Sequence, residues 1–354
     1  TEELKELVQK SHERGMKVVL DAVYNHTGRE FFAFQDILEK GEKSKYLDWY
    51  FIDELPPRGE WGEIPNFKCF GYYGGMPKLN LKNPEVEKYI TDVACYWIKE
   101  CDIDGWRLDV GDEISHFFWK NFRKAVKAVK KDMLIIGEIW HYAGDFLEGD
   151  EWDTVMNYPF YLNLIDLLAD EKITVSQFVQ NLGYLKGRLH KNCYPLMWNL
   201  IDSHDTARFL HLCNDNKKKQ HLAAAFQLLL PGMPMIYYGD EYAMPGANDP
   251  DCRRGMYWDE EYQDKEMYEW YKRLIQVRKS HACIVEGELA GIVTEDEEGT
   301  VVLIRKNGEE TIAMIFNCSS SAKQFNEYTQ KYNLLTENTF DGNVEGFDAA
   351  VIVL

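Results

Sequence analysis

The sequence predicts an α/β fold in which parallel strands alternate with helices, arranged as a (β/α)8, or TIM, barrel. Short apolar runs that end in polar residues alternate with helical periodicity over most of the 354 residues. Three of these runs end in a carboxylate, at Asp109, Glu138 and Asp205, and the carboxyl ends of parallel strands converge at one end of a barrel. After about residue 283, short strands without helices predict a separate all-β domain.

The predicted elements follow one another in a regular order. A helix is expected in residues 1–15 and a buried strand in MKVVLDAVYNH, residues 16–26. The next strands are expected to end at five polar residues: Asp109, Glu138, Asn157, Asp205 and Asp240. Helices are expected over residues 84–100, 113–131, 160–189 with breaks, 206–229 and 262–281.

This pattern contains about six βα units, whereas a closed parallel barrel needs eight. The chain begins at Thr1 inside a helical pattern, and we therefore expect the barrel to be N-terminally truncated. Residues 27–80 are rich in aromatic residues, Gly and Pro, which predicts an inserted subdomain after the first strand. The expected domains are a barrel of residues 1–283, with the insertion at 27–80, and a C-terminal β-sandwich of residues 284–354.

The composition limits the partners of the protein. The formal net charge of -19 argues against nucleic acid or an anionic membrane surface, but not against a neutral sugar. No run of about 18 apolar residues predicts a membrane span. The eight cysteines form no CxxC pair, so zinc is not indicated. We expect buried free thiols and a cytoplasmic location.

The strand-end carboxylates suit glycosidic-bond chemistry, in which one carboxylate attacks and another transfers a proton. Arg107 precedes Asp109 by two residues, which places both side chains on the same side of a strand. Its charge would hold Asp109 ionised, as a nucleophile requires. The alternative interpretation is a buried structural ion pair.

Glu138 follows the apolar run MLIIG and precedes Trp140. Apolar and aromatic surroundings, together with a second carboxylate, would raise its pKa, as a general acid needs. Alternatively, Glu138 is a strand-end residue that accepts backbone hydrogen bonds.

His204 and Asp205 end the run PLMWNLIDSHD. An ionised Asp205 could hold sugar hydroxyls and favour a cationic transition state. On spacing alone, Asp202 competes with Asp205 for this role. Asp240 and Glu241 follow another strand and are expected to anchor a loop.

Five motifs, DAVYNH, GWRLD, GEIW, SHD and PMIYYGDE, resemble those of the α-amylase superfamily, glycoside hydrolase family 13, in type and in order. MPKLN (76–80), DVGDE (109–113) and NDPDCRRGMYW (248–258) resemble its branch of neopullulanases, cyclomaltodextrinases and maltogenic amylases. The resemblance covers nearly the whole chain. It implies a catalytic barrel followed by a β-sandwich domain.

By this resemblance, Asp109 is the nucleophile, Glu138 the acid/base and Asp205 the transition-state stabiliser. Further residues are implied in substrate binding. They are His26, Arg107 and His204 around the sugar at the cleavage site, Asp249 and Arg253 around the next sugar on the non-reducing side, and Trp140 on the leaving-group side. For Trp140, a core tryptophan is the alternative interpretation.

The implied function is that of a retaining glycoside hydrolase, which cleaves α-1,4-glucosidic bonds of maltooligosaccharides, cyclodextrins or pullulan by double displacement. The alternatives are a transglycosylase or an α-1,6-glucan-cleaving enzyme of the same superfamily, or a non-catalytic glucan-binding relative. Members of the branch usually carry an N-terminal β-domain that dimerises, so a full-length parent could be a homodimer.

No metal ligands are predicted and no cofactor is required. Many members of the superfamily bind calcium with the Asn of the first motif and a His four residues after the nucleophile. Here Asn25 is present, but Glu113 stands at the second position. Calcium is therefore disfavoured at that place.

Overall fold

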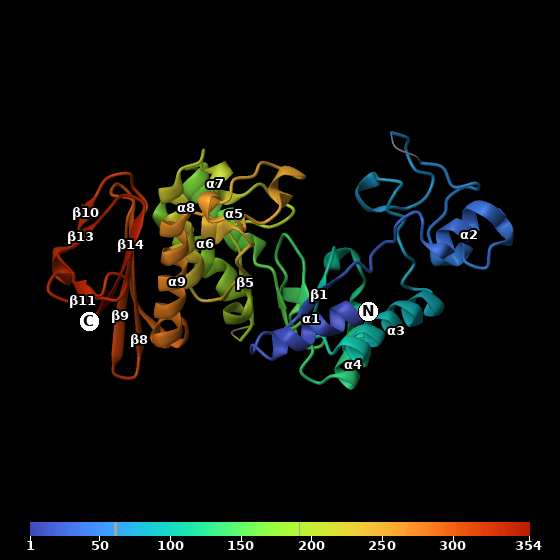
Figure 1. Cartoon of the computed structure of the whole chain (residues 1–354), viewed down its shortest axis with the longest axis horizontal. Helices are drawn as coiled ribbons and strands as arrows, with labels where there is room; N and C mark the ends of the chain where they lie inside the picture. Colours follow the sequence, from blue (N-terminus) through green and yellow to red (C-terminus); the bar gives the residue numbers. More distant parts are fainter. Residues whose placement is uncertain (60–61, 191) are drawn as a thin grey trace. The chain divides into compact units, whose positions relative to one another are not determined.

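A computed structural model describes residues 1–59, 62–190 and 192–354. The chain forms two compact units. The N-terminal unit comprises Thr1–Ile139 and Ala143–Val155, and the C-terminal unit comprises Trp140–Tyr142 and Met156–Leu354. Figure 1 labels their helices and strands. No helix in the described ranges is long and apolar enough to cross a membrane.

The N-terminal unit is built on a parallel sheet of strand order β1-β2-β3-β4. Its strands are β1 (Val19–Ala22), β2 (Gly105–Leu108), β3 (Leu134–Gly137) and β4 (Thr154–Val155). In the ladder, Asp21 pairs with Arg107, and Leu108 pairs with Gly137. The strands therefore end nearly level, and the residues that follow β2 and β3 lie at the same edge of the sheet.

Helices precede the strands as the apolar spacing predicts. They are α1 (Glu2–His12), α3 (Pro84–Cys101) and α4 (His116–Val129). The side chain of Asn83 accepts a hydrogen bond from the backbone of Glu85, and Pro84 opens α3, which is a favourable helix start. Ser115 caps α4 in the same way. Because of this cap, α4 begins three residues later than predicted, after the short helix η4 (Gly111–Glu113).

The insertion after β1 contains α2 (Phe32–Lys40) and the short helices η1 (Gly41–Lys43), η2 (Leu47–Trp49) and η3 (Phe70–Tyr72). Its aromatic residues form a small core of their own, in which the ring of Phe34 lies 5.1 Å from that of Tyr50 and 5.2 Å from that of Phe67. The predicted subdomain also includes residues 60 and 61, which lie outside the described residues.

The C-terminal unit contains two further parallel strands, β5 (Trp198–Asn199) and β6 (Met233–Pro234). Its helices are α5 (Tyr158–Leu164), the π-helical η6 (Ile165–Ala169), α6 (Val175–Arg188), α7 (Phe209–Leu212), α8 (Lys217–Leu229), α9 (Lys265–Ser280) and α10 (Cys283–Glu286). Across the described part of the chain, four parallel strands in the first unit and two in the second give the predicted six. A barrel of eight units stays a prediction.

The single helix predicted over residues 206–229 is wrong, because it is divided into α7 and α8. Asn214 and Asp215 adopt left-handed backbone conformations between them, with φ of 54° and 59°, which stop the first helix. The side chain of Asn216 then caps α8 by accepting a hydrogen bond from the backbone of Lys218. These three residues are common in turns and caps, so the break has a local signal.

The C-terminal residues form the predicted all-β domain. Its main sheet has strand order β12-β11-β14-β9-β8-β7, and these strands are β7 (Glu288–Glu295), β8 (Thr300–Asn307), β9 (Glu310–Asn317), β11 (Tyr332–Asn333), β12 (Asn338–Thr339) and β14 (Asp348–Val353). A second pair is formed by β10 (Lys323–Gln324) and β13 (Asn343–Val344). The change from helices to strands falls between α10 and β7, while the exact domain boundary stays a prediction.

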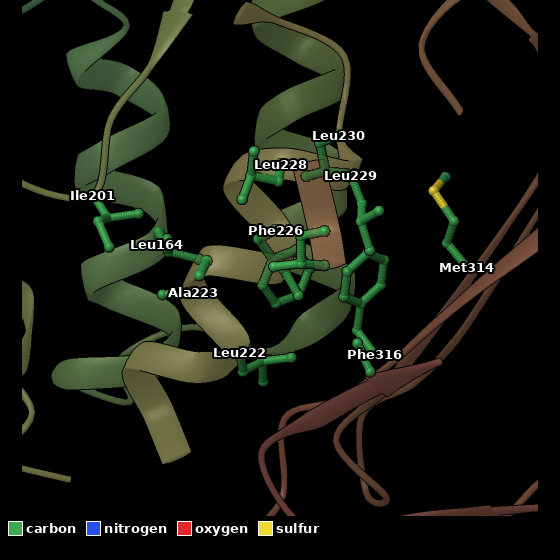
Figure 2. Close-up of a cluster of buried hydrophobic side chains, with 14 of the residues drawn as sticks. Leu164, Ile201, Leu222, Ala223, Phe226, Leu228, Leu229, Leu230, Met314 and Phe316 are labelled. Carbon is green, nitrogen blue, oxygen red and sulfur yellow. The ribbon is translucent and has the colours of Figure 1, made fainter. Parts of the chain in front are cut away.

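Both faces of β9 are buried, which explains its continuous apolar run. Ile312, Met314 and Phe316 belong to a core that also includes α8 and α9, whereas Ala313 and Ile315 belong to a second core within the β domain. Figure 2 shows Phe226 of α8 beside Phe316 of β9. The main sheet therefore packs one face on the helices of its own unit.

Candidate active site

Arg107 joins three carboxylates at the ends of β1, β2 and β3. Its guanidinium nitrogens lie 2.8 Å from Asp109 Oδ1, 3.1 Å from Asp21 Oδ2 and 3.0 Å from Glu138 Oε2. Arg107 is only 8% exposed. Burial alone would lower the pKa of Arg107, but the charges of Glu138, Asp21 and Asp109 outweigh it and raise the pKa above its ordinary value. This cation is thus fixed among the carboxylates.

Glu138 is buried, but its surroundings are not purely apolar. Besides the ion pair with Arg107, its Oε2 accepts a hydrogen bond of 2.9 Å from the backbone N–H of Val110. Glu138 therefore accepts a backbone hydrogen bond, as the alternative interpretation expects. It also shares Arg107 with a second carboxylate, Asp109. The role of Glu138 as the general acid stays a prediction.

The backbone that follows β2 has an unusual conformation at Val110, the residue that donates this hydrogen bond to Glu138. Val110 adopts a left-handed conformation with φ of 48°, which is strained for a β-branched residue and costs about 1–3 kcal/mol. The ring of Trp152 covers the two glycines that flank the site, since a Cβ added at Gly111 would lie 2.8 Å from it and one added at Gly137 would overlap it. Trp152 therefore packs closely against the chain next to both Asp109 and Glu138.

His26 follows β1 and is buried, with its ring stacked on that of Phe70 at 5.2 Å. Burial lowers the pKa of His26, although the charge of Asp109 opposes this shift. The imidazole is therefore neutral at neutral pH, when it has one N–H donor and one acceptor.

An ammonium group lies between Asn25 and Glu113, the positions at which the family resemblance raises the question of a calcium site. Lys78 donates to Asn25 Oδ1, and its Nζ lies 3.1 Å from Glu113 Oε2 and 3.2 Å from the backbone oxygen of Glu113. In the part of the chain that the structure describes, no group of three or more His, Cys, Asp or Glu side chains has the arrangement of metal ligands. These residues therefore do not fit a calcium ion, because the lysine already supplies the positive charge.

The C-terminal unit brings together four other predicted residues. Asp205 Oδ2 lies 3.0 Å from His204 Nε2, and Asp205 Oδ1 lies 3.2 Å from Arg253 Nη2. Arg253 Nε lies 3.2 Å from Asp249 Oδ1 and donates to the backbone oxygen of His204 at 2.8 Å. Asp205 is thus held between an arginine and a histidine while remaining partly exposed.

Asp202, the competitor of Asp205, is almost completely buried. Its Oδ2 accepts a hydrogen bond of 2.7 Å from the backbone N–H of Phe209, and its carboxyl group is hydrogen-bonded to that of Asp240. Asp240 in turn accepts a hydrogen bond of 3.1 Å from Arg208. Asp202 therefore stabilises the interior, and Asp240 anchors its loop as expected.

Asp202 and Asp240 must share a proton. Among the described residues, neither Asp202 Oδ1 nor Asp240 Oδ2 has a hydrogen-bond donor, so one proton between the two carboxyl groups satisfies both oxygens. Burial raises the pKa of Asp240 well above its ordinary value, and the charge of Asp202 raises it further. We assign the proton to Asp240.

Trp140 is not a core tryptophan, since 40% of it is exposed. Its ring stacks on that of Tyr158 at 4.0 Å with an interplanar angle of 13°. Tyr158 is fully buried and was not predicted as a site residue. Its signal in the sequence is the aromatic cluster NYPFY after the expected strand end at Asn157.

Seven of the nine predicted residues thus form two clusters, each within its own unit, whereas His26 and Trp140 stack on other aromatic rings. Arg107, Asp109 and Glu138 lie together in the N-terminal unit, and His204, Asp205, Asp249 and Arg253 lie together in the C-terminal unit. Sequence reasoning did not predict that Asp21 would be a third partner of Arg107, or that Lys78 would bind Asn25. Both contacts depend on strand and loop pairings that join distant segments.

Comparison with known proteins shows the family of the chain. The family model described as "Alpha amylase, catalytic domain" matches residues 1–264. The cyclomaltodextrinase of Geobacillus thermopakistaniensis (strain MAS1) is 46% identical over 323 residues, which cover 91% of this chain and 55% of that protein. Neopullulanase 2 of Thermoactinomyces vulgaris is 42% identical over 312 residues, 88% of this chain and 53% of that protein.

The solved structure of a cyclomaltodextrinase superposes with a TM-score of 0.92 at 38% identity, covering 99% of this chain and 62% of that one. The fold is therefore that of an α-amylase catalytic domain, a TIM barrel followed by a β domain. The chain spans about half the length of the curated relatives that it matches.

Proposed function

This chain belongs to the alpha-amylase family, and on that premise we propose that it is a retaining glycoside hydrolase. Its proposed substrates are the α-1,4-glucosidic bonds of maltooligosaccharides, cyclodextrins or pullulan. The observation that carries the proposal is the position of Asp109 and Glu138, which follow adjacent strands and bind the same arginine. Two carboxylates at neighbouring strand ends are the equipment of a double displacement.

In the proposed first step, the Asp109 carboxylate attacks the anomeric carbon while protonated Glu138 gives its proton to the glycosidic oxygen. The bond between the anomeric carbon and the glycosidic oxygen breaks, and the part of the glucan that carries this oxygen leaves. A covalent glycosyl-enzyme remains. In the second step, Glu138 takes a proton from water, whose oxygen replaces Asp109 at the anomeric carbon. Both carboxyl groups then regain their starting states.

The contacts of the other residues support their proposed roles. Arg107 pairs with Asp109 and holds its carboxylate in place for attack. Asp205, held by His204 and Arg253, supplies a negative charge that would favour the cationic transition state. We propose that Asp249 and Arg253 hold the next sugar on the non-reducing side, that His26 and His204 contact the sugar at the cleavage site, and that Trp140 contacts the leaving group.

The stereochemistry of the product tests the mechanism. Proton NMR of maltotriose hydrolysis should show that the first product formed has the α configuration, because two displacements restore it. Glu138→Gln should lower kcat by about 10²-fold or more, whereas Asp150→Asn, which removes a carboxylate from an exposed pair with Lys120, should leave kcat unchanged. A β product would exclude the double displacement, and equal rates for Glu138→Gln and the parent chain would exclude Glu138 as the acid/base.

The alternative functions are separable by product analysis. A transglycosylase or an α-1,6-specific enzyme would use the same carboxylates, so maltotriose, cyclodextrin and pullulan should be compared as substrates. Disproportionation products without net hydrolysis would favour the transglycosylase. A non-catalytic glucan-binding protein would bind these glucans and release no product.

We also propose a cytoplasmic location, supported by the cysteines. All eight lie within the described residues and are free thiols, which is the usual state of cysteine in a reducing compartment. Cell fractionation with an antibody against the chain would test this proposal.

A further inference from the structure

A pocket of about 420 Å³ lies within the C-terminal unit, beside the segment that follows Glu138 in the sequence. Its walls come from Trp140–Tyr142, from α5 and η6, and from α6. Its volume falls within the range of about 300–1,000 Å³ that is typical of ligand-binding pockets.

Aromatic side chains line this pocket although they contribute little to the core. Tyr184 is 68% exposed and Trp140 is 40% exposed. The stacking of Trp140 on buried Tyr158 fixes the orientation of its ring. Large aromatic surfaces that gather at a pocket and are held in place indicate binding rather than folding.

Arg188 holds two of the aromatic walls. Its guanidinium carbon lies 3.9 Å from the ring centre of Tyr142 and 5.4 Å from that of Tyr184. The hydroxyl of Tyr142 donates to the backbone oxygen of Arg188 at 2.8 Å, and Arg188 Nη1 donates to the hydroxyl of Tyr184 at 3.4 Å. These contacts order the rings before any ligand arrives, which lowers the entropic cost of binding.

Fixed polar groups complete the pocket. Asn181 Nδ2 donates to Asn163 Oδ1 at 2.8 Å, and Asn163 Nδ2 donates to the backbone oxygen of Phe178 at 3.0 Å. Asp166 adds a partly exposed carboxylate to the lining. Aromatic faces suit the C–H faces of a pyranose, while the amide, carboxylate and guanidinium groups suit its hydroxyls.

We propose that this pocket binds glucosyl residues of an α-glucan on the leaving-group side of the cleaved bond, with Tyr142, Tyr184 and Arg188 as binding residues. The inference rests on the proposed function, because Trp140 is assigned to the leaving-group side. Substrates long enough to reach Tyr184 gain binding energy that shorter substrates lack. The same pocket would hold an acceptor sugar, so its occupancy favours transfer to sugar over transfer to water.

The kinetic test compares a long and a short substrate. Tyr184→Ala should lower kcat/KM for maltoheptaose by roughly 3- to 10-fold, because one aromatic contact is lost. It should change kcat/KM for maltotriose by less than about twofold. Tyr332→Ala is the matched control, since it removes an exposed tyrosine on β11 and should affect neither substrate. Equal effects of Tyr184→Ala on both substrates, or no effect on either, would overturn the proposal.

A binding measurement separates this proposal from the proposed function. Maltoheptaose is titrated calorimetrically into the Glu138→Gln chain with and without Tyr184→Ala, and circular dichroism confirms that both are folded. A Kd raised at least about threefold by Tyr184→Ala supports the pocket even if the parent chain hydrolyses nothing, in which case only the proposed function fails. An unchanged Kd, with hydrolysis intact, rejects the pocket and leaves the proposed function standing.

Arg188→Lys provides a second variant that keeps the charge. An ammonium group cannot stack between the two tyrosine rings as a planar guanidinium does. We therefore expect Arg188→Lys to weaken maltoheptaose binding in the same assay. Binding that is unchanged in both Tyr184→Ala and Arg188→Lys would show that the ordered tyrosines do not contact the glucan.

Discussion

Two buried arginines, Arg107 and Arg208, hold carboxylates in different ways. Arg107 binds three carboxylates that lie at strand ends, and two of them, Asp21 and Asp109, are partly exposed to solvent. Arg208 donates to Asp240, which is itself hydrogen-bonded to a second buried acid, Asp202. One positive charge does not offset the desolvation of two ionised carboxylates when both are buried. The cluster around Arg208 therefore retains a proton, which we assign to Asp240.

The shared proton makes the stability of the parent chain depend on pH, and Asp240→Asn should remove this dependence. Because burial raises the folded pKa of Asp240 above its unfolded value, the folded chain keeps a proton that the unfolded chain releases. The parent chain should therefore lose stability as pH rises above about 4, the ordinary pKa of Asp. The amide of the Asn variant keeps its donor at every pH and avoids this loss.

Urea unfolding at pH 4.5 and pH 8 would measure this difference. The free energy of unfolding of Asp240→Asn, relative to that of the parent, should rise from pH 4.5 to pH 8. The groups that act on Asp240 or share its surroundings are Asp202, Arg208, Glu241 and Tyr271, and both proteins contain all of them. Asp240→Ala is the control, since it leaves Asp202 and Arg208 without their partner and should be less stable at both values. A relative stability of Asp240→Asn that is constant with pH would contradict the assignment.

At the scale of elements, close packing of one side chain holds in place the two strand ends that carry Asp109 and Glu138. Trp152 lies against the backbone at Gly111 and Gly137, which flank Asp109 and Glu138 in the sequence. Only glycine leaves room for the indole ring at these positions. The ends of β2 and β3 are therefore held by the same side chain.

Gly137→Ala should consequently reduce both stability and activity. Its new methyl group overlaps Trp152, and overpacking of this kind lowers the free energy of unfolding by about 1–3 kcal/mol. Gly183→Ala is the matched control, because a Cβ there meets nothing within 4 Å. In the helix interior it should be neutral or should stabilise α6 by about 0.5–1 kcal/mol. Urea unfolding and maltotriose hydrolysis would show whether the two variants differ in this way.

Lys78 attaches the end of the insertion to the residues that follow β1 and β2, through Asn25 and Glu113. Lys78→Ala leaves the buried side-chain oxygen of Asn25 without its charged donor and should destabilise the chain by about 1–3 kcal/mol. Lys43→Ala, an exposed substitution in the same insertion, should change stability by less than about 0.5 kcal/mol.

Because the ammonium group of Lys78 supplies positive charge between Asn25 and Glu113, we expect a metal chelator to leave the thermal midpoint of the parent chain unchanged. Differential scanning calorimetry with and without EDTA would measure this. A lower midpoint with EDTA, restored by added calcium, would show that a metal ion stabilises the insertion after all.

At the scale of the whole molecule, the C-terminal β domain shares a core with the helices of its unit. Phe226 of α8 stacks on Phe316 of β9 at 4.2 Å, and Met314 belongs to the same cluster (Figure 2). The apolar face of the main sheet is thus covered by helices. Stability of these helices and of the β domain should be coupled.

Phe316→Ala should therefore destabilise the helices as well as the sheet. Loss of a fully buried phenylalanine costs about 3–5 kcal/mol, and hydrogen exchange should speed up in α8 as well as in β9. Phe117→Ala, at an exposed position on α4, should leave exchange in both elements unchanged. Faster exchange in β9 alone would mean that the β domain unfolds independently.

Local patterns in the sequence predict the order of the elements and place carboxylates at the ends of strands. Helix bounds such as those of α3 and α9 depend on apolar spacing and on caps at Asn83 and Asp264, which are local signals. The alternation of strands with helices predicted that Asp109 and Glu138 would follow adjacent parallel strands. These features depend on neighbours a few residues apart, and a pattern in the sequence records them directly.

Which charged groups contact one another depends on how distant segments of the chain pack together in the folded structure. Arg107 binds Asp21, 86 residues away, and Lys78 binds Asn25, 53 residues away. The proton shared by Asp202 and Asp240 and the pocket between Trp140 and α6 likewise join separate segments. Ion pairs and pockets depend on distances of a few ångströms in space, and those distances arise from strand pairing and core packing between segments that carry no mark of one another in the sequence.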